Sequence, residues 1–180
     1  PLGLGHAVWC ARKLVGGEPF ALLLPDMVMH AKPGCLRQMM DVYEDRGGGN
    51  VIAVEEVPWD QVHRYGIVAA EDWRDNSFSI ARMVEKPKRE DAPSNLIISG
   101  RYILQPEVFN LLATQTAGAG GEIQLTDAMQ RLMSEQDFHA FKYAGQDYDC
   151  GDKLLYLEAF AAMALAHPEL GAKARAVLEA

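Results

Sequence analysis

The sequence predicts a single α/β domain with a mixed central sheet, a β insertion and a helical C-terminal segment. Three observations support this prediction. Helix and strand patterns alternate over the first part of the chain, three strand patterns then follow without a helix between them, and helical spacing dominates the last part. Such alternation is typical of layered α/β folds with right-handed crossovers.

The first four elements carry the α/β alternation. Gly5–Val15 has apolar residues at helical spacing and ends at a pair of glycines, so we expect a helix. Phe20–Pro25 (FALLLP) is a short apolar run that suits a strand covered on both faces, as in a parallel sheet. Cys35–Arg46 predicts a second helix, closed by three glycines, and Asn50–Val57 predicts a strand rich in β-branched residues.

The middle of the chain is richer in β-structure, and its end is helical. The strands expected in the middle are Gly66–Ala70, Ser77–Glu85 and Asn95–Leu104. The elements expected after them are the helices Pro106–Thr114 and Leu125–Glu135, the strand Phe138–Tyr148, and the helices Gly151–Ala166 and Pro168–Leu178. Because the sequence has no repeat and no low-complexity linker, we expect one domain over residues 1–180, with residues 151–180 as its C-terminal helical segment.

The composition excludes several classes of function. Of the 180 residues, 49% are hydrophobic and 23% are charged, and the net charge is -8. This apolar content argues against disorder, and the acidic balance argues against a nucleic-acid binder, which would carry a basic patch. The apolar stretches Phe20–Leu24 and Leu154–Leu165 are too short or too interrupted to span a membrane. We therefore expect neither nucleic acid nor a membrane as a partner.

The cysteines and the first residue give two further expectations. Cys10, Cys35 and Cys150 are an odd number without metal-ligand spacing, which predicts reduced thiols in a cytoplasmic protein. The chain starts with Pro1 rather than Met, and Pro-Leu-Gly-Leu-Gly is typical of the interior of a chain. We therefore expect this sequence to be the downstream part of a longer protein.

Two aspartates are the first candidates for chemistry, because each follows a predicted strand. Asp26 ends the apolar run FALLLP, and Asp149 follows the strand Phe138–Tyr148. In open α/β sheets ligands bind beyond the carboxyl ends of the strands, and Mg²⁺ typically takes one or two protein carboxylates there. The residues alone leave two alternatives open: Asp26 as a turn aspartate and Asp149 as the N-cap of the next helix.

A second candidate group lies around Glu85 and Lys86, which close the strand Ser77–Glu85. A carboxylate beside an ammonium suits a polyhydroxylated phosphate, since the carboxylate accepts hydroxyl protons and lysine neutralises phosphate. Tyr65-Gly66 marks a point where the backbone can approach a ligand, and Gly3 can present backbone amides. A solvated charge cluster and a simple bend remain the alternatives at these positions.

Taken in order, seven segments resemble one family, the bacterial UTP–glucose-1-phosphate uridylyltransferases, also called UDP-glucose pyrophosphorylases. These segments are PLGLGHAV (Pro1–Val8), LLLPD (Leu22–Asp26), YGIV (Tyr65–Val68), VEKPK (Val84–Lys88), APSNLIISGRY (Ala92–Tyr102), GEIQLTDA (Gly121–Ala128) and YDCGDK (Tyr148–Lys153). The resemblance covers essentially the whole chain. It implies a Rossmann-like nucleotidyltransferase fold with a mixed, mainly parallel sheet.

The resemblance also implies a reaction and its partners. UTP and glucose 1-phosphate would give UDP-glucose and pyrophosphate with the help of Mg²⁺, in a cytoplasmic enzyme that supplies UDP-glucose for polysaccharide biosynthesis. The family's usual assembly implies a homodimer or homotetramer. The apolar residues that surround the predicted helix Gly151–Ala166, among them Leu157 and Phe160, are in keeping with self-association.

The site residues implied by the resemblance are carried over position by position. Asp26 and Asp149 match the two family aspartates that hold the metal. Lys86 matches the lysine that meets the sugar phosphate, and Glu85 the carboxylate that binds glucose hydroxyls. Gly3 matches a residue whose backbone contacts uracil. Gly66 and Ile98 match residues whose backbone contacts the sugar, and Tyr65 lies next to Gly66.

One departure from the family pattern bears on activity. The glycine-rich Gly-x-Gly-Thr-Arg loop that cradles the triphosphate belongs upstream of Pro1, together with the first strand of the sheet, and this chain does not contain it. We therefore expect these residues alone to be incomplete for catalysis and to expose a sheet edge. A catalytically silent sugar-nucleotide-binding or scaffold module is the alternative function. A divergent glycosyltransferase would need an Asp-x-Asp motif after a strand, and Asp147-Tyr148-Asp149 is the only such triplet.

Overall fold

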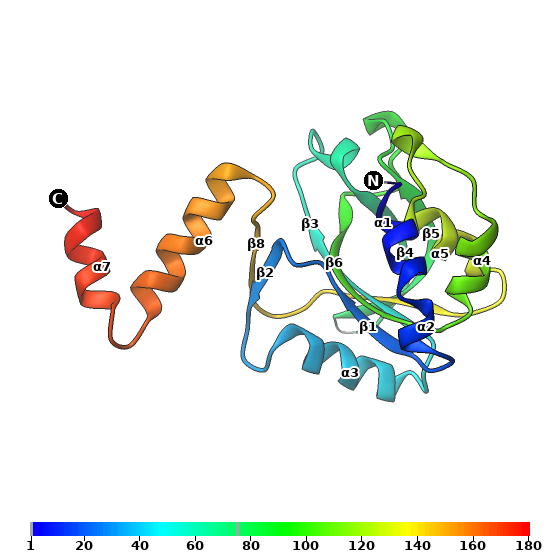
Figure 1. Ribbon diagram of the computed structural model, residues 1–180, viewed down its shortest axis with the longest axis horizontal. Helices are drawn as coiled ribbons and strands as arrows, with labels where there is room; N and C mark the ends of the chain where they lie inside the picture. Colours follow the sequence, from blue (N-terminus) through cyan, green and yellow to red (C-terminus); the bar gives the residue numbers. More distant parts are fainter. Residues whose placement is uncertain (1, 75) are drawn as a thin grey trace.

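A computed structural model describes residues 2–74 and 76–180 (Figure 1). Within these residues, six strands form one sheet in the order β1-β6-β3-β7-β5-β4, and two more strands form a separate ribbon, β2-β8. The strands are β1 (Phe20–Leu23), β2 (Met27–His30), β3 (Asn50–Glu56), β4 (Gly66–Arg74), β5 (Ser77–Glu85), β6 (Leu96–Leu104), β7 (Phe138–Phe141) and β8 (Gln146–Asp149).

Helices cover both faces of the six-stranded sheet (Figure 1). The helices are α1 (Leu4–Cys10), α2 (Arg12–Val15), α3 (Cys35–Asp45), α4 (Val108–Thr114), α5 (Leu125–Leu132), α6 (Lys153–Ala166) and α7 (Gly171–Leu178), with short 3₁₀ turns η1 (Val62–Arg64), η2 (Arg89–Asp91) and η3 (Ala119–Gly121). Side chains of α1, α4 and α5 pack on one face, and side chains of α3 pack on the other.

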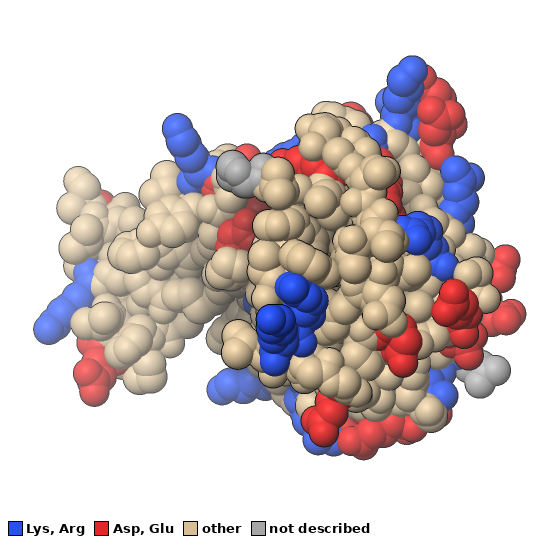
Figure 2. All heavy atoms as spheres, turned by 45° about the vertical axis from the view of Figure 1, so that its right-hand side comes forward, with Lys and Arg blue, Asp and Glu red and all other residues tan. Residues whose placement is uncertain are grey.

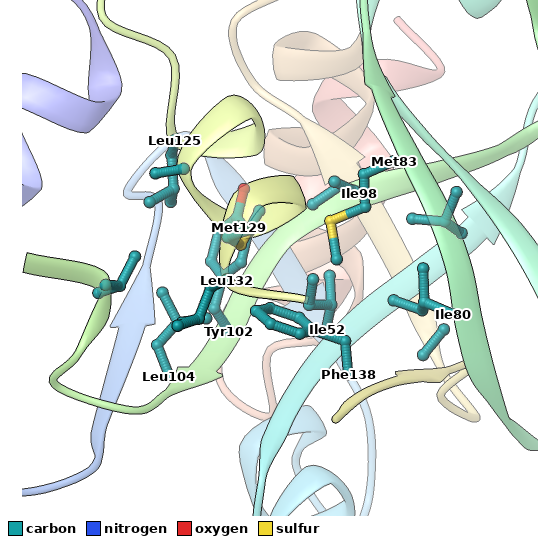
Figure 3. Packing of buried hydrophobic residues seen from close by; sticks show 14 of the residues in the cluster. Ile52, Ile80, Met83, Ile98, Tyr102, Leu104, Leu125, Met129, Leu132 and Phe138 are labelled. Atoms are coloured by element: carbon teal, nitrogen blue, oxygen red, sulfur yellow. The ribbon is translucent and has the colours of Figure 1, made fainter. Parts of the chain in front are cut away.

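The larger core lies between the sheet and helices α1, α4 and α5. Leu125, Met129 and Leu132 of α5 face the sheet residues in Figure 3, and each is at most 2% exposed. Successive strand residues alternate between the two cores: Ile52 joins the α5 side, whereas Val51 joins the α3 side. Burying each such side chain contributes about 1.5–3 kcal/mol, so this core anchors α5 firmly against the sheet.

The expected mixed, mainly parallel sheet is confirmed in the strand directions of the described residues, where β1, β3, β4 and β7 run one way and β5 and β6 the other. Only β3 and β7 pair in parallel, with Asn50 opposite Phe138, and the other pairings are antiparallel. The reason is the position of β6. It lies between β1 and β3 and is antiparallel to both, so two strands that run in the same direction are not hydrogen-bonded to each other.

The expected strand Phe138–Tyr148 is in fact two strands in different sheets. β7 ends at Phe141 inside the main sheet, and β8 starts at Gln146 and pairs with β2. The chain turns at Gly145, where a Cβ atom would stand 2.6 Å from Ala31 Cβ. β2 has no counterpart among the sequence-based predictions. It forms because the chain after Asp26 continues as a strand, with Met27 paired to Asp149.

Most other elements agree with the sequence-based expectations within a few residues, and Ser77–Glu85 agrees at both ends. The expected helix Gly5–Val15 is broken at Ala11 into α1 and α2. In the described residues β1 is a terminal strand of the sheet and pairs only with β6, and the expected exposure of an edge by a missing strand stays a prediction.

The C-terminal helices α6 and α7 pack against each other and extend away from the sheet (Figure 1). Their outer surface carries few charges in Figure 2 and exposes large apolar side chains, including Leu157 at 61% and Phe160 at 68%. Across the described part of the chain, no helix combines the length and the apolar character that crossing a membrane requires.

Candidate functional site

The structure brings Asp26 and Asp149 together. Asp26 lies in the corner between β1 and β2, and Asp149 is the last residue of β8. The two loops are tied by backbone, since the Cys150 N–H donates to the Asp26 carbonyl at 2.8 Å and Met27 pairs with Asp149 across the ribbon. The carboxylate pair, as we call Asp26 and Asp149, is therefore positioned by main-chain hydrogen bonds.

Gly151 leaves the space beside the carboxylate pair open. A Cβ atom at this glycine would stand 3.0 Å from Asp149 Oδ1 and 3.7 Å from Asp26 Oδ2. Both oxygens thus approach one point that a side chain would otherwise occupy. Asp149 is oriented by two further contacts: the Gly151 N–H donates to Oδ1 at 3.0 Å, and the Tyr65 hydroxyl donates to Oδ2 at 3.3 Å.

The surroundings of the carboxylate pair are acidic. Burial first, then a hydrogen bond to Asp147 and the charges of Asp147 and Asp149, raise the pKa of Glu55 to about 9. A divalent cation would offset the negative charge of Asp147 and Asp149. Two carboxylates with open space beside them also match the donor set that Mg²⁺ usually takes from a protein. The residues present therefore fit a magnesium ion.

A magnesium ion at this point would need ligands from outside the chain. In residues 2–74 and 76–180, no group of three or more His, Cys, Asp or Glu side chains is arranged to hold a metal ion. Mg²⁺ keeps several waters and binds readily to substrate phosphates, so a two-carboxylate site is sufficient for it.

A second set of predicted residues converges at Gly66, which is buried at the start of β4. A Cβ atom on Gly66 would stand 3.0 Å from each of three atoms: Glu85 Oε2, Ile98 Cδ1 and Thr126 Oγ1. Glu85 reaches this point because it pairs with Gly66 across β4 and β5, and Ile98 comes from β6. We call Gly66, Glu85, Ile98 and Thr126 the Gly66 cluster.

The charge of the Gly66 cluster is set by Glu85. Burial raises the pKa of this carboxyl, while a hydrogen bond from Thr126 and the charge of Lys86 oppose the increase. Lys86 Nζ lies 3.8 Å from Glu85 Oε1. Lys86 has a φ of 45°, which is uncommon for a residue other than glycine, and strained backbone of this kind clusters at functional sites. Its N–H donates to the Tyr65 carbonyl at 3.0 Å, which fixes this conformation.

Two tyrosines connect the carboxylate pair with the Gly66 cluster. Tyr65 precedes Gly66, accepts the Lys86 N–H through its carbonyl and contacts Asp149 through its hydroxyl. Burial first, and then the charges of Glu85 and Asp26, raise the pKa of Tyr102 on β6. The charges of both groups therefore act on the Tyr102 hydroxyl, and the contacts of Tyr65 join the two groups directly.

The need for glycine at position 3 follows from its close packing against the segment before α5. Its φ is 104°, and a Cβ atom there would stand 2.7 Å from the Ile123 carbonyl oxygen. Ile123 makes two hydrogen bonds to this turn: its N–H donates to the Leu2 carbonyl at 2.7 Å, and its carbonyl accepts the Gly5 N–H at 2.8 Å. The opening turn is thus held against the residues that lead into α5. The expected contact of Gly3 with uracil stays a prediction.

Three residues of the site region were missed by sequence reasoning. In the sequence Thr126 indicates only the start of a helix. Its place among the apolar residues of that helix face is the one sequence signal that could have identified it, since buried polar residues often have a specific partner. The Arg101 guanidinium donates to the carbonyls of Leu24, Gly100 and Met27 and so fixes the corner that carries Asp26. Asp152 caps α6 by accepting from the N–H groups of Leu154 and Leu155, so Asp149 is not the cap of this helix.

Comparison with known proteins places this chain in a family. Residues 1–165 match the family model of the nucleotidyl transferases, and the chain belongs to this family.

Within that family, the relatives bear out the resemblance drawn from the seven segments. A curated UTP–glucose-1-phosphate uridylyltransferase from Staphylococcus epidermidis is 44% identical over 98% of this chain and 61% of its own length. A solved UDP-glucose pyrophosphorylase complexed with UDP-glucose is 40% identical, with a TM-score of 0.85, over 89% of this chain and 61% of its own. A UTP-bound structure from Acinetobacter baumannii is 39% identical, with a TM-score of 0.85, over 99% of this chain and 62% of its own. The chain thus spans about 60% of the length of these proteins.

Proposed function

We propose that this chain forms the sugar-phosphate and metal-binding part of a UTP–glucose-1-phosphate uridylyltransferase. The observation that carries the proposal is the double convergence described above: Asp26 with Asp149, and Glu85 with Gly66 and Ile98, joined through Tyr65. The reaction would convert UTP and glucose 1-phosphate into UDP-glucose and pyrophosphate. The relatives named above support this choice of substrates.

Asp26 and Asp149 are proposed to hold Mg²⁺. When bound, the ion would neutralise phosphate charge between the two substrates. Tyr65 and the Gly151 N–H orient Asp149 through its two carboxylate oxygens. Cys150 and Arg101 fix the backbone on either side of Asp26.

The Gly66 cluster is proposed to bind the sugar phosphate. Glu85 accepts hydrogen bonds from glucose hydroxyls, and Lys86, with its side chain 42% exposed, meets the phosphate. Gly66 and Ile98 would contact the sugar through their backbone, with Tyr65 beside them. Gly3 would contact uracil through its backbone, at the opposite end of the product.

The proposed reaction needs alignment more than acid–base chemistry. A phosphate oxygen of glucose 1-phosphate attacks the α-phosphorus of UTP, a new P–O bond forms, and the bond to pyrophosphate breaks on the opposite side. The nucleophile is already anionic, so no general base is required. Lys86 reduces the repulsion between the two anions, and Glu85 fixes the sugar so that its phosphate points along the line of attack.

Transfer is proposed to need a glycine-rich triphosphate loop in addition to these residues. The test compares this chain with a fusion in which a segment that contains the Gly-x-Gly-Thr-Arg loop is joined before Pro1. We expect Mg²⁺-dependent pyrophosphate release from UTP and glucose 1-phosphate by the fusion and none by the 180 residues alone. A fusion that binds UDP-glucose without turning over would favour a silent binding module and contradict the proposal.

The helices α6 and α7 are proposed to form a homodimer or homotetramer contact. Their exposed apolar side chains, among them Leu157, Phe160 and Val177, have no cover in the described residues. Light scattering at micromolar concentration should give a dimer or tetramer that Phe160→Glu converts to a monomer. A wild-type monomer would contradict this.

The cellular setting is also part of the proposal. The odd number of cysteines without metal-ligand spacing supports a cytoplasmic setting. There the enzyme would supply UDP-glucose for polysaccharide biosynthesis.

A further inference from the structure

We propose that Thr126 is a positioning residue, whose hydroxyl holds the Glu85 carboxylate in the orientation that binds the sugar hydroxyls. This inference rests on the proposed function for its sugar ligand, but the contact between Thr126 and Glu85 exists without any ligand. Neither residue pattern nor family resemblance assigned a role to Thr126.

The geometry brings Thr126 and Glu85 to one point. Thr126 Oγ1 and Glu85 Oε2 each lie 3.0 Å from the position that a Cβ atom of Gly66 would occupy. The Thr126 hydroxyl and the Glu85 carboxylate thus approach the same point, and the hydroxyl, as a hydrogen-bond donor to the carboxylate, opposes the rise of the Glu85 pKa. On its other oxygen, Oε1, the carboxylate faces Lys86 Nζ at 3.8 Å. Glu85 is therefore held from two sides, by a neutral donor from α5 and by a cation that follows it in sequence.

Thr126 is itself rigidly placed. It is only 7% exposed and lies in the first turn of α5, next to Leu125, which is 2% exposed. The apolar face of this helix is buried in the larger core. A β-branched side chain in a helix has few rotamers, so its hydroxyl points in a fixed direction. The amino end of a helix also favours a nearby negative charge, which adds to the effect of the hydroxyl on Glu85.

The Thr126 hydroxyl matters because burial disfavours the ionised form of Glu85, and only that form accepts hydrogen bonds on both carboxylate oxygens. Burial raises the pKa of Glu85, and the negative charges of Asp127 and Glu122 act in the same direction. Thr126 and Lys86 are the groups that oppose these effects. A half-buried carboxylate that lost one of its two supports would take up a proton at higher pH and would bind sugar hydroxyls less well as an acceptor.

The experiment compares Thr126→Val, which removes the hydroxyl but keeps the shape, with Thr126→Ser, which keeps the hydroxyl. Thr114→Val, on the exposed part of α4, is the matched control. Two quantities are measured on the 180-residue chain: the pH midpoint of the Glu85 carboxyl carbon by NMR, and the affinity for glucose 1-phosphate by calorimetry. Mg²⁺ affinity is recorded as a check on the carboxylate pair.

We expect Thr126→Val to raise the pH midpoint of Glu85 and to weaken glucose 1-phosphate binding about tenfold, with Mg²⁺ affinity unchanged. Thr126→Ser should stay within about threefold of wild type in sugar binding and close to it in the Glu85 titration. Thr114→Val should change neither quantity.

The inference is overturned if Glu85 in Thr126→Val titrates as in wild type, or if Thr126→Ser behaves like Thr126→Val, because either result would leave only a packing role for Thr126. A wild-type chain that does not bind glucose 1-phosphate would defeat the proposed function instead. In that case the Glu85 titration decides alone: an upward shift in Thr126→Val supports the positioning role, and an unchanged midpoint refutes it.

Discussion

The carboxylate pair and the Gly66 cluster are built in different ways, although Tyr65 joins them. Asp26 and Asp149 stand at the ends of short strands, Asp26 is exposed, and backbone hydrogen bonds set their positions. The Gly66 cluster lies inside the six-stranded sheet, where packing from β4, β5, β6 and α5 sets every position.

The difference fits the two proposed ligands. A magnesium ion brings its own water ligands, so it needs charge and free space more than a shaped cavity. A sugar is recognised by the directions of its hydroxyl groups, so it needs side chains that do not move. Four changes to the molecule separate these two modes of binding, from the largest expected effect to the smallest.

The largest effect is expected at the carboxylate pair. Asp149→Asn in the fusion should lower the rate of pyrophosphate release by about 100-fold or more, since preorganised charge is usually the largest single contribution in such a site. The matched control is Asp41→Asn, an exposed aspartate on α3 that only pairs with Arg37. Equal losses in both variants would show that the effect is not specific to the site.

The next effect tests the free space beside the pair. Gly151→Ala places a methyl group 3.0 Å from Asp149 Oδ1 and should weaken Mg²⁺ binding by about tenfold, as the removal of supporting groups around a metal commonly does. Gly34→Ala, where nothing lies within 4 Å of the added carbon, is the control and should bind Mg²⁺ as wild type does. Calorimetry with Mg²⁺ measures both, and equal affinities would mean that the space at Gly151 is not used.

A pH effect of similar size is expected in the Gly66 cluster. Glu85 accepts hydroxyl protons only as a carboxylate, and burial raises its pKa above the ordinary value of 4.5. Binding of glucose 1-phosphate should therefore be complete above this raised pKa and be lost as the pH falls through it. Glu85→Gln should bind about tenfold more weakly at high pH and lack this loss, keeping only the titration of the sugar phosphate itself. A wild-type profile identical in shape to that of Glu85→Gln would remove Glu85 from sugar binding.

The smallest effect is expected at the connection between the two groups. Tyr65→Phe removes a hydroxyl that bonds Asp149 at 3.3 Å, a long contact in a half-buried position. We expect Mg²⁺ affinity to fall about threefold and the free energy of unfolding to fall by about 1 kcal/mol or less. A loss as large as that in Gly151→Ala would mean that side-chain contacts, and not the backbone, position the carboxylate pair.

Sequence patterns indicated which acidic residues come together better than they indicated the strands that bring them together. Asp26 and Asp149 stand out in the sequence because each is a carboxylate that follows a predicted strand. The pairing of β2 with β8 that brings them together is not visible in the sequence, because Gly145 packs closely against Ala31 and His30, which are far away in sequence.

The direction of β6 and the role of Thr126 were missed for a similar reason. A strand's neighbours are set by long-range packing, so an apolar run alone does not distinguish parallel from antiparallel pairing. Thr126 matches a common helix start, and only the convergence of three strands and α5 at Gly66 shows what its hydroxyl contacts.

The central claim is that Asp26 and Asp149 bind one divalent ion together. A double-mutant cycle tests it most directly, with Mn²⁺ binding followed by electron paramagnetic resonance in wild type, Asp26→Asn, Asp149→Asn and the double variant. We predict one bound ion in wild type, a strong loss of affinity in each single variant, and little further loss in the double variant, because the second carboxylate has no ion left to hold. Two ions in wild type, or losses that simply add, would show that the two carboxylates act separately.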